Sequence, residues 1–392
     1  MSPTGPRDDG APRGSPAEPG GGAGRAAGPG FTGSGLGRAG GRLAVVARAP
    51  GRVNLIGEHT DYNQGLALPV AIDLRTTVHF VPDGSGRLRL TTSVDRAPAT
   101  VEVHPPPGPA DVTAFRPRWA RLVAALVMEG RPARGGTIRI TSSVPAGSGL
   151  SSSAAVCVAL ALALGVATDP VATAELCRRA EAAAGSEVGL MDPLVSMAGK
   201  AGHGLLVDFS DLGWEAVPIP AGAELVVVHS GVDRVLSSTG YPARRAECAA
   251  AARELGVPLG RAGASEAAGI AEPTLRRRAR YVVAECARVR SFAAALRQGD
   301  VALAGEVMAA SHWGQAQEFE VSTPVVDELV RELSTTPGVH GARLTGGGFG
   351  GCVVALAEPG AVDPGRWPGR VTRVVPSDGA SVEVEPGTGA QP

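Results

Sequence analysis

One short stretch of the sequence combines glycines and hydroxyl side chains in an arrangement that suits phosphate groups. It reads Gly147-Ser148-Gly149-Leu150-Ser151-Ser152-Ser153 and is directly followed by an apolar, alanine-rich run at 154–164. Glycine lets a backbone approach a ligand closely and adopt positive φ angles, and the free N–H groups of a helix's first turn favour an anion. We therefore expect a phosphate-binding loop that suits the triphosphate tail of a nucleotide.

The elements around this loop follow the order strand, loop, buried helix. Residues 137–141 alternate β-branched and polar side chains as a strand does, and residues 154–164 are apolar on every face. The simpler alternative is a surface loop whose serines only cap a core helix. A Walker A motif is excluded, because the only lysine, Lys200, has Leu194 where that motif requires its first glycine.

A second stretch, residues 52–63, is dense in polar side chains. It brings Arg52, Glu58, His59 and Asp61 together around a few apolar residues and a glycine. Carboxylates and an imidazole can each fix a sugar hydroxyl by charge-assisted hydrogen bonds. We interpret the stretch as a binding segment for a ligand with many hydroxyl groups. The alternative is an exposed turn whose charges are incidental.

Two carboxylates follow the apolar run. Glu181 lies near the end of a helix expected at 171–184, and Asp192 directly precedes Pro193 in a helix expected to end at residue 198. From local sequence alone, Asp192 is also explained as a helix N-cap with proline at the first helical position. Glu181 is explained as a solvated helix residue. Both carboxylates therefore have a structural as well as a functional interpretation.

Length, composition and charge narrow the class of protein. A chain of 392 residues, 44% of them hydrophobic, is long enough for two soluble domains with cores of their own. The formal net charge of -1 gives no electrostatic basis for binding nucleic acid or an anionic membrane. The densest basic run, residues 276–280, is interpreted as a solvated helix face. The five cysteines are scattered without a C-x-x-C pair, so we expect no disulfide or zinc site and a reducing cytoplasm.

The two ends of the chain differ in composition from the rest. Residues 1–42 are dominated by glycine, proline, alanine and arginine, and residues 377–392 are rich in glycine, proline and glutamate. Such segments bury too little apolar surface to offset the entropy of ordering. We expect a disordered arm at 1–42 and a disordered tail at 377–392, with no export signal or membrane span.

Between these ends the hydrophobic pattern predicts strands and helices in mixed order. A glycine-rich run at 345–351 formally matches G-x-G-x-x-G, but a strand follows it. We therefore interpret it as a turn that lets two backbones, or a backbone and a ligand, approach closely, and not as a Rossmann loop. Strands are expected at 43–50, 66–72, 76–81, 87–92, 99–103, 137–141, 205–209, 223–230, 339–344 and 352–357, and helices at 120–128, 154–164, 171–184, 193–198, 242–255, 273–297, 301–313 and 323–333.

Three stretches in this order resemble galactokinases of the GHMP small-molecule kinase superfamily. Pro50 to Tyr62 is close to the galactokinase signature, whereas Gly147 to Ala154 and Leu344 to Cys352 resemble motifs shared across the superfamily. The resemblance extends over about residues 43–357. Shorter segments similar to galactokinases lie at 117–120, 238–245 and 320–324.

The resemblance implies a fold and an activity. The fold would be α+β with two domains, at 43–212 and 213–376, and the active site in the cleft between them. The activity would be ATP-dependent phosphorylation of galactose at its anomeric hydroxyl, giving galactose 1-phosphate and ADP. We expect ATP and Mg²⁺ as cofactors and a monomer without nucleic-acid or membrane partners.

The resemblance also assigns roles by position. Asp192 would be the catalytic carboxylate beside the anomeric hydroxyl and Arg52 the neighbouring cation, while Ser153 and Glu181 would be the Mg²⁺ ligands. Glu58, His59, Asp61, Gly189 and Tyr241 would fix the sugar hydroxyls, and Gly147, Ser148, Gly149, Leu150, Ser151, Ser152 and Ser153 would hold the phosphates. The assignment is coherent, because phosphoryl transfer needs positioning and neutralisation of charge more than covalent chemistry.

The sequence departs from the family pattern beside the catalytic position. Galactokinases usually read Cys-Gly-Ile-Met-Asp-Gln there, whereas this chain reads Val188-Gly189-Leu190-Met191-Asp192-Pro193. Proline removes a backbone donor and restricts the residue before it. Two alternatives stay open: a sugar 1-kinase acting on another acceptor, such as arabinose or an amino sugar, and a non-catalytic sugar sensor on the same scaffold.

Overall fold

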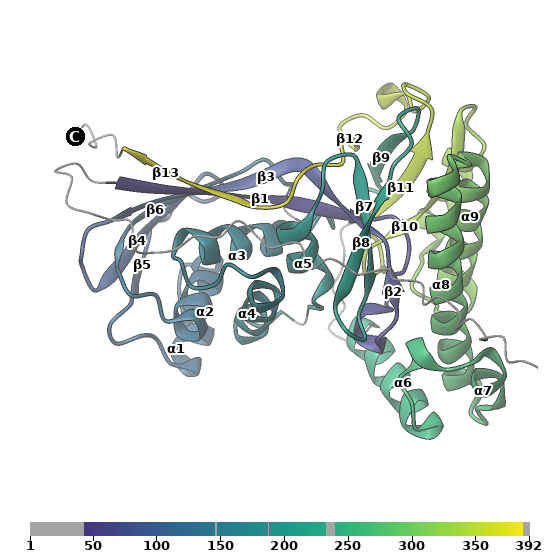
Figure 1. Ribbon diagram of the computed structural model, residues 1–392, viewed down its shortest axis with the longest axis horizontal. Helices are drawn as coiled ribbons and strands as arrows, with labels where there is room; N and C mark the ends of the chain where they lie inside the picture. The colour runs from purple at the N-terminus through teal and green to yellow at the C-terminus, as the bar shows by residue number, and fades with distance from the viewer. Residues whose placement is uncertain (1–42, 146, 187, 233–239, 387–392) are drawn as a thin grey trace, which may run out of the picture.

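The computed structural model describes residues 43–145, 147–186, 188–232 and 240–386. The arm expected at 1–42 lies outside these residues, as do residues 387–392 of the expected tail. The described chain folds into helices and strands in mixed order, as predicted, and three sheets organise it (Figure 1).

The largest sheet has six strands in the order β13-β1-β3-β6-β4-β5. Neighbouring strands are antiparallel except β4 and β6, which run parallel. The strands are β1 (Leu43–Asn54), β3 (Pro69–Pro82), β4 (Arg87–Thr92), β5 (Ala99–Glu102), β6 (Gly136–Ser142) and β13 (Ser381–Pro386).

The helices of the first half of the chain lie on one face of this sheet (Figure 1). The central one, α3, is apolar on every side because the sheet covers one face and other helices surround the rest; nine of its residues are buried. The helices are α1 (Pro109–Ala114), α2 (Arg121–Gly130), α3 (Ser152–Ala163), α4 (Pro170–Ala183) and α5 (Met191–Ala198).

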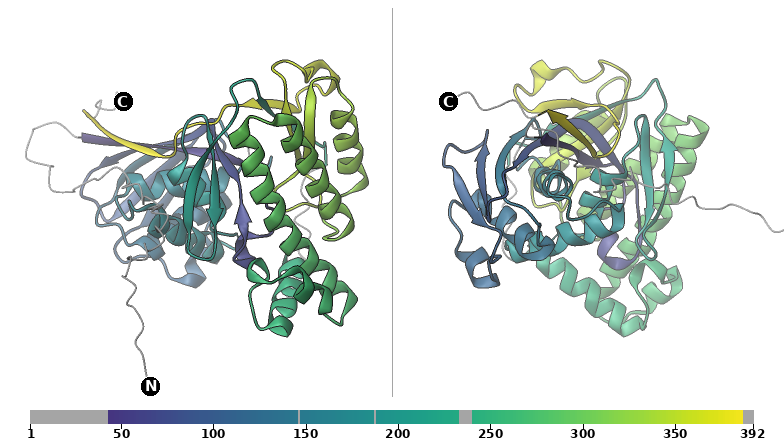
Figure 2. Two further views of the ribbon diagram at one scale, coloured as in Figure 1. Left: turned by 45° about the vertical axis from the view of Figure 1, so that its right-hand side comes forward. Right: turned by 60° about the vertical axis from the view of Figure 1, so that its left-hand side comes forward.

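The second half of the chain builds an antiparallel sheet in the order β10-β11-β9-β12. Helices α8 and α9 stand beside it, and α6 and α7 lie at one end of α8 (Figure 2). The strands are β9 (Glu224–His229), β10 (Val339–Thr345), β11 (Cys352–Ala357) and β12 (Val371–Val374); the helices are α6 (Gly240–Leu255), α7 (Ala264–Gly269), α8 (Pro273–Gln298), α9 (Val301–Gln317) and α10 (Pro324–Ser334).

A three-stranded sheet of β2 (Leu66–Ala67), β7 (His203–Asp208) and β8 (Gly213–Pro218) lies between the two halves (Figures 1 and 2). Strand β8 was not predicted. The division predicted between residues 212 and 213 runs through the turn of the β7–β8 hairpin. The two-domain boundaries themselves stay a prediction.

The prediction of a disordered tail from residue 377 is wrong for residues 381–386. These residues form β13, which pairs antiparallel with β1 over six residue pairs from Leu43–Pro386 to Arg48–Ser381. The pairing satisfies backbone groups along the edge of β1, and Val382 packs against the core of the sheet. Backbone pairing thus orders a segment whose side chains alone carry little apolar surface.

Candidate active site

The loop before α3 follows a path with positive φ angles, which its glycines allow. Gly147, Gly149 and Ser151 adopt left-handed conformations with φ angles of 73°, 78° and 60°. Between described residues, no hydrogen bond is donated by the backbone N–H groups from Gly147 to Ser153. These N–H groups converge at the amino-terminal end of α3, which favours an anion. The positive φ angles expected from the glycines are present, and phosphate binding by this loop stays a prediction.

This loop is held against strand β1. The Arg52 N–H donates to the Leu150 carbonyl oxygen over 3.1 Å, at a bulge where β1 changes register against β3. A Cβ atom at Gly51 would lie 2.5 Å from the same oxygen. Glycine at this position therefore allows strand β1 and the loop before α3 to touch.

Arg52 and Asp192 form a bidentate pair beside the loop. Arg52 Nε and Nη2 lie 2.7 and 2.6 Å from the two carboxylate oxygens of Asp192, and Nη1 donates to the Gly149 carbonyl oxygen over 2.7 Å. The hydroxyl of Ser151 also donates to Asp192. Paired charges with this geometry are fixed in direction. The predicted catalytic carboxylate, its cation and the phosphate loop are therefore in direct contact.

The alternative interpretation of Asp192, as a helix N-cap, is wrong. Helix α5 begins at Met191, with Leu190 as its N-cap, because the Leu194 N–H already bonds to the Leu190 carbonyl oxygen over 3.1 Å. Asp192 is thus the second helical residue, and its carboxylate binds Arg52 instead of backbone N–H groups. Pro193 is the third helical residue, where no N–H is needed by the helix.

We expect Pro193→Gln to leave the sugar-kinase activity that the resemblance implies nearly unchanged. The first-turn position costs no helical hydrogen bond, so the proline neither distorts α5 nor moves Asp192. Steady-state kinetics of the variant should give a kcat within about threefold of the original. A large gain in turnover would show instead that Pro193 holds Asp192 away from its best position.

Ser153 and Glu181 meet at the start of α3. The Ser153 hydroxyl donates to Glu181 Oε2 over 2.9 Å, and Glu181 Oε1 is buried without a hydrogen-bond partner among the described residues. Burial raises the pKa of Glu181 to about 7, and the nearby charge of Asp192 adds to the rise. Within the described part of the chain, no group of three or more His, Cys, Asp and Glu side chains could hold a metal. A hydroxyl and an unsatisfied carboxylate suit a cation that phosphate oxygens also bind.

Asp61 and Gly189 lie together at a cavity of about 390 Å³. A Cβ at Gly189 would lie 1.7 Å from Asp61 Oδ2, so a side chain there would displace this carboxylate. Burial raises the pKa of Asp61 to about 6, with the charge of Asp192 contributing. The cavity wall is made by Asp61, Tyr62, Arg178, Ala182, Val188, Gly189, Leu190, Phe209 and Arg245.

The raised pKa of Asp61 predicts a pH-dependent stability effect. Since the folded protein holds this proton more tightly than an ordinary carboxyl of pKa 3.8, the stability contributed by Asp61 increases as pH falls through about 6 and levels off below the ordinary value. The ionised form is therefore the costly one. We expect Asp61→Asn to be more stable than the original protein at about pH 7.5 and to lose this advantage near pH 4.5, as measured by urea unfolding. An equal difference at both pH values would contradict the assignment.

Glu58 points into the protein interior and not into this cavity. Its side chain is 2% exposed, and Oε1 accepts a hydrogen bond from the Gly346 N–H over 2.9 Å. Its other oxygen forms an ion pair with the fully buried Arg343. Burial raises the pKa of Glu58, and Arg343 opposes the rise. The loop between β1 and Asp61, which carries Glu58, is thereby attached to the glycine-rich turn that follows β10.

A second buried carboxylate, Glu285 of α8, also contacts Arg343 and the loop after β1. Its Oε1 accepts from the Gly57 N–H over 3.0 Å and lies 3.6 Å from Arg343 Nη2. Arg343 also donates to the Leu55 carbonyl oxygen over 3.0 Å. Sequence analysis missed Arg343 and Glu285. Arg343 is a charged residue within the mostly buried strand β10, and Glu285 is a charged residue on the buried face of α8. A charge at a position expected to be buried is the sequence signal that could have identified each of them.

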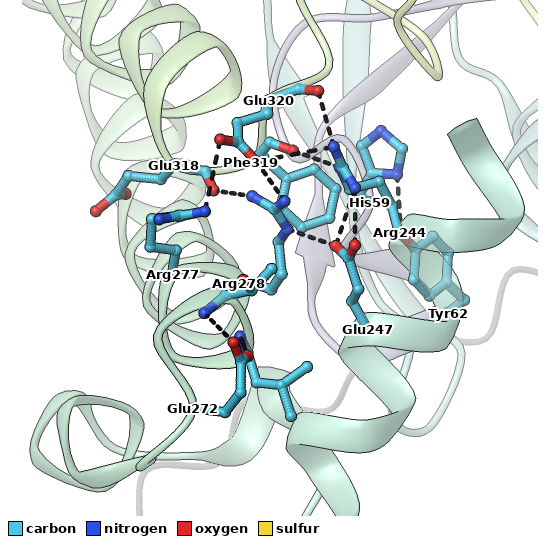
Figure 3. Close-up of polar contacts among 12 residues, drawn as sticks. His59, Tyr62, Arg244, Glu247, Glu272, Arg277, Arg278, Glu318, Phe319 and Glu320 are labelled. Atoms are coloured by element: carbon cyan, nitrogen blue, oxygen red, sulfur yellow. Dashed lines mark hydrogen bonds and ion pairs between the residues drawn. The ribbon is translucent and has the colours of Figure 1, made fainter. Parts of the chain in front are cut away.

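His59, in the loop after β1, contacts Tyr241 of α6. Their rings lie 5.4 Å apart, centre to centre, and the ring of Phe319 lies 4.7 Å from His59 on the side shown in Figure 3. His59 Nδ1 is 2.9 Å from the Tyr62 hydroxyl. Of the five predicted sugar residues, Asp61 and Gly189 thus form one group and His59 and Tyr241 another, while Glu58 lies apart in the interior.

The chain matches three protein-family models in the order in which these parts occur. They are described as "Galactokinase galactose-binding signature" over residues 37–82, "GHMP kinases N terminal domain" over 119–200 and "GHMP kinases C terminal" over 292–364. Over 327 residues, 80% of this chain and 83% of the relative, it is 40% identical to galactokinase of Homo sapiens. The chain belongs to the galactokinase family.

Other galactokinases and related kinases agree with this assignment. The chain is 42% identical over 326 residues to galactokinase of Mycobacterium tuberculosis, covering 80% of this chain and 89% of the relative. The structure of Lactococcus lactis galactokinase complexed with galactose aligns with a TM-score of 0.77 at 25% identity, over 86% of this chain and 95% of that one. Methanococcus jannaschii mevalonate kinase, with a TM-score of 0.62 at 16% identity over 85% and 98% of the two chains, shares the fold. The GHMP kinase fold expected from the sequence is confirmed.

Proposed function

We propose that this galactokinase family member transfers the γ-phosphoryl group of ATP to the anomeric hydroxyl of galactose, giving galactose 1-phosphate and ADP. The observation that carries the proposal is the bidentate Arg52–Asp192 pair held against the phosphate loop. It combines a carboxylate for the attacking hydroxyl with a cation for the phosphoryl group. These are the two charges that an in-line transfer requires.

Asp192 has the catalytic role in this proposal. Its carboxylate accepts from the sugar hydroxyl and orients it towards the γ-phosphoryl group. Arg52 holds the carboxylate in a fixed direction through two hydrogen bonds, and its guanidinium neutralises charge that develops on the phosphoryl oxygens. Ser151, which donates to the same carboxylate, limits its rotation.

The nucleotide is assigned to the amino-terminal end of α3. The loop Gly147, Ser148, Gly149, Leu150, Ser151, Ser152 and Ser153 presents its N–H groups to the phosphates. Ser153 and Glu181 would hold Mg²⁺, and the buried, unpartnered Oε1 of Glu181 supports this assignment. When bound, the cation would supply charge neutralisation to the phosphate oxygens.

The sugar is assigned to the cavity that Asp61 and Gly189 line. Asp61 accepts hydrogen bonds from ring hydroxyls there, and the absence of a side chain at Gly189 leaves its carboxylate in place. His59, in the loop after β1, and Tyr241 of α6 both contact Tyr62, which lines the same cavity, and we assign them to the edge of the sugar site. Glu58 orients the loop through Gly346 and Arg343, and any contact of its own with the sugar requires its carboxylate to turn from this pairing.

We infer that the protein acts as a cytoplasmic monomer. Support for the cytoplasm comes from the five cysteines, all in described segments, which are buried and reduced. Among the described helices, none combines the length and apolar composition needed to span a bilayer.

An ADP-release assay with a panel of sugars tests the proposed activity. Galactose should be phosphorylated well above arabinose, galactosamine and glucose. Preference for arabinose or an amino sugar would identify a different acceptor, and no turnover with any sugar would identify a sensor. No observation of the site favours either alternative.

A further inference from the structure

Two arginines converge on the short segment Glu318–Glu320 that follows α9 (Figure 3). One of them, Arg278, belongs to the basic run predicted to be a solvated helix face, and for this residue the prediction is wrong. Its side chain is 2% exposed, against 45% for its neighbour Arg277. A buried cation requires specific partners, so its contacts indicate what it does.

Each nitrogen group of the Arg278 guanidinium has a partner. Nε donates to Glu247 over 2.6 Å, Nη1 to the Glu318 carbonyl oxygen and Nη2 to the Glu320 carboxylate. These partners come from α6 and from the end of α9. Such a planar set of bonds fixes direction as well as charge, which a lysine cannot reproduce.

Arg244 of α6 binds the same segment from the other side. Its Nε donates to the Phe319 carbonyl oxygen over 2.7 Å, and Nη2 donates to the Glu320 carbonyl oxygen over 3.3 Å. Its Nη1 lies 2.9 and 3.0 Å from the two oxygens of Glu247. Three successive carbonyl groups thus accept from two arginines. Their bonds hold Glu320 in a left-handed conformation with φ of 56°, which is unfavourable for glutamate.

The held segment presents Phe319 to the proposed sugar site. Phe319 is fully buried, and its ring lies 4.4 Å from Tyr281 and 4.7 Å from His59. His59 itself has a left-handed backbone with φ of 64°, so packing must hold it in place. On its other side is Tyr241, which lies three residues before Arg244 on α6. The two arginines therefore hold the segments that carry Phe319 and Tyr241, two of the three aromatic neighbours of His59, the third being Tyr62.

We propose that Arg278 and Arg244 are positioning residues for sugar binding: by fixing Glu318–Glu320 and the first turn of α6, they set the orientation of His59 between Phe319 and Tyr241. The proposal rests on the proposed sugar-binding function of His59 and Tyr241. Among the described contacts, neither arginine touches Arg52, Asp192 or the phosphate loop. Loss of the arrangement should therefore weaken sugar binding and spare nucleotide binding.

Arg278→Lys and Arg277→Lys form a matched pair for the test. Both keep the charge on neighbouring residues of α8, and both arginines contact Glu320, but Arg277 does so from an exposed position at 3.6 Å. We expect Arg278→Lys to raise KM for galactose by about tenfold or more while KM for ATP changes by less than about twofold. Arg277→Lys should change neither value. A parallel change in both KM values, or an unchanged KM for galactose in Arg278→Lys, would overturn the proposal.

A second variant and a binding measurement separate positioning from loss of stability. Phe319→Leu keeps the buried apolar character but removes the ring beside His59. It should show the same selective rise in KM for galactose. If Arg278→Lys does not fold, Phe319→Leu alone tests the proposal. Binding is followed by the rise in Tm that galactose or a non-hydrolysable ATP analogue produces. The positioning variants should lose the galactose-induced rise and keep that of the analogue. If the original protein itself shows neither turnover nor a Tm rise with galactose, the proposed function fails. If the original protein shows both and the variants bind and phosphorylate galactose equally well, the positioning role fails.

Discussion

Asp192→Asn should lower kcat by about a thousandfold while the protein stays folded. The amide has nearly the same size and can still accept a hydrogen bond from Arg52 and Ser151, so packing is preserved. It cannot carry the negative charge that orients or deprotonates the attacking hydroxyl. General-base groups contribute about 10² to 10⁴ to rates, and a thousandfold loss is a barrier increase of about 4 kcal/mol.

The measurement combines ADP release with a thermal melt on the same preparation. Asp169→Asn is a suitable control, since Asp169 caps α4 at a solvent-exposed position and asparagine also caps helices well. The control should keep its kcat. A folded Asp192→Asn protein with a kcat within about tenfold of the original would refute a catalytic role for this carboxylate.

The second large effect concerns the C4 epimer of galactose. We expect kcat/KM for galactose to exceed that for glucose by about a thousandfold or more. A site that hydrogen-bonds one particular hydroxyl leaves buried polar groups unpaired when the hydroxyl points elsewhere, and such sites discriminate steeply. Asp61 is such a group, because burial already raises its pKa to about 6 and an unpaired charge there is costly.

Competition between the two sugars in one reaction mixture gives this ratio directly. Asp61→Ala should reduce the discrimination and raise KM for galactose more than KM for ATP, because the phosphate loop lies elsewhere in the site. Similar kcat/KM values for both sugars would move the assignment to a different acceptor. An Asp61→Ala defect confined to ATP would contradict the assignment of the cavity to sugar.

The parts of the site that were predicted from sequence have local causes. The loop from Gly147 to Ser153 needs glycines for positive φ angles and an apolar helix behind it, and both are adjacent in the chain. Thr323 is a further local case, since its hydroxyl caps α10 and Pro324 follows it directly in the sequence. Such features depend on neighbours within a few residues, so they can be predicted from the sequence of one protein.

The parts that were missed depend on partners far along the chain. Glu58 accepts from a backbone group 288 residues away, and Arg278 binds Glu320, 42 residues away. No periodic pattern connects such positions, so a buried arginine in a basic run looks the same as a solvated one. The start of α5 was predicted two residues too late, at Pro193 and not at Met191, because capping preferences of neighbouring residues compete at a helix start.

The return of β13 to the edge of β1 affects how the protein is made. The chain forms five strands and five helices of the first half, then the whole second half, and only then supplies the last strand of the first sheet. During synthesis, the backbone groups of β1 on that side have no strand partner until residues 381–386 have left the ribosome. An open strand edge can pair with other chains, so the arrival of β13 is the step that protects this edge of the nascent sheet from aggregation.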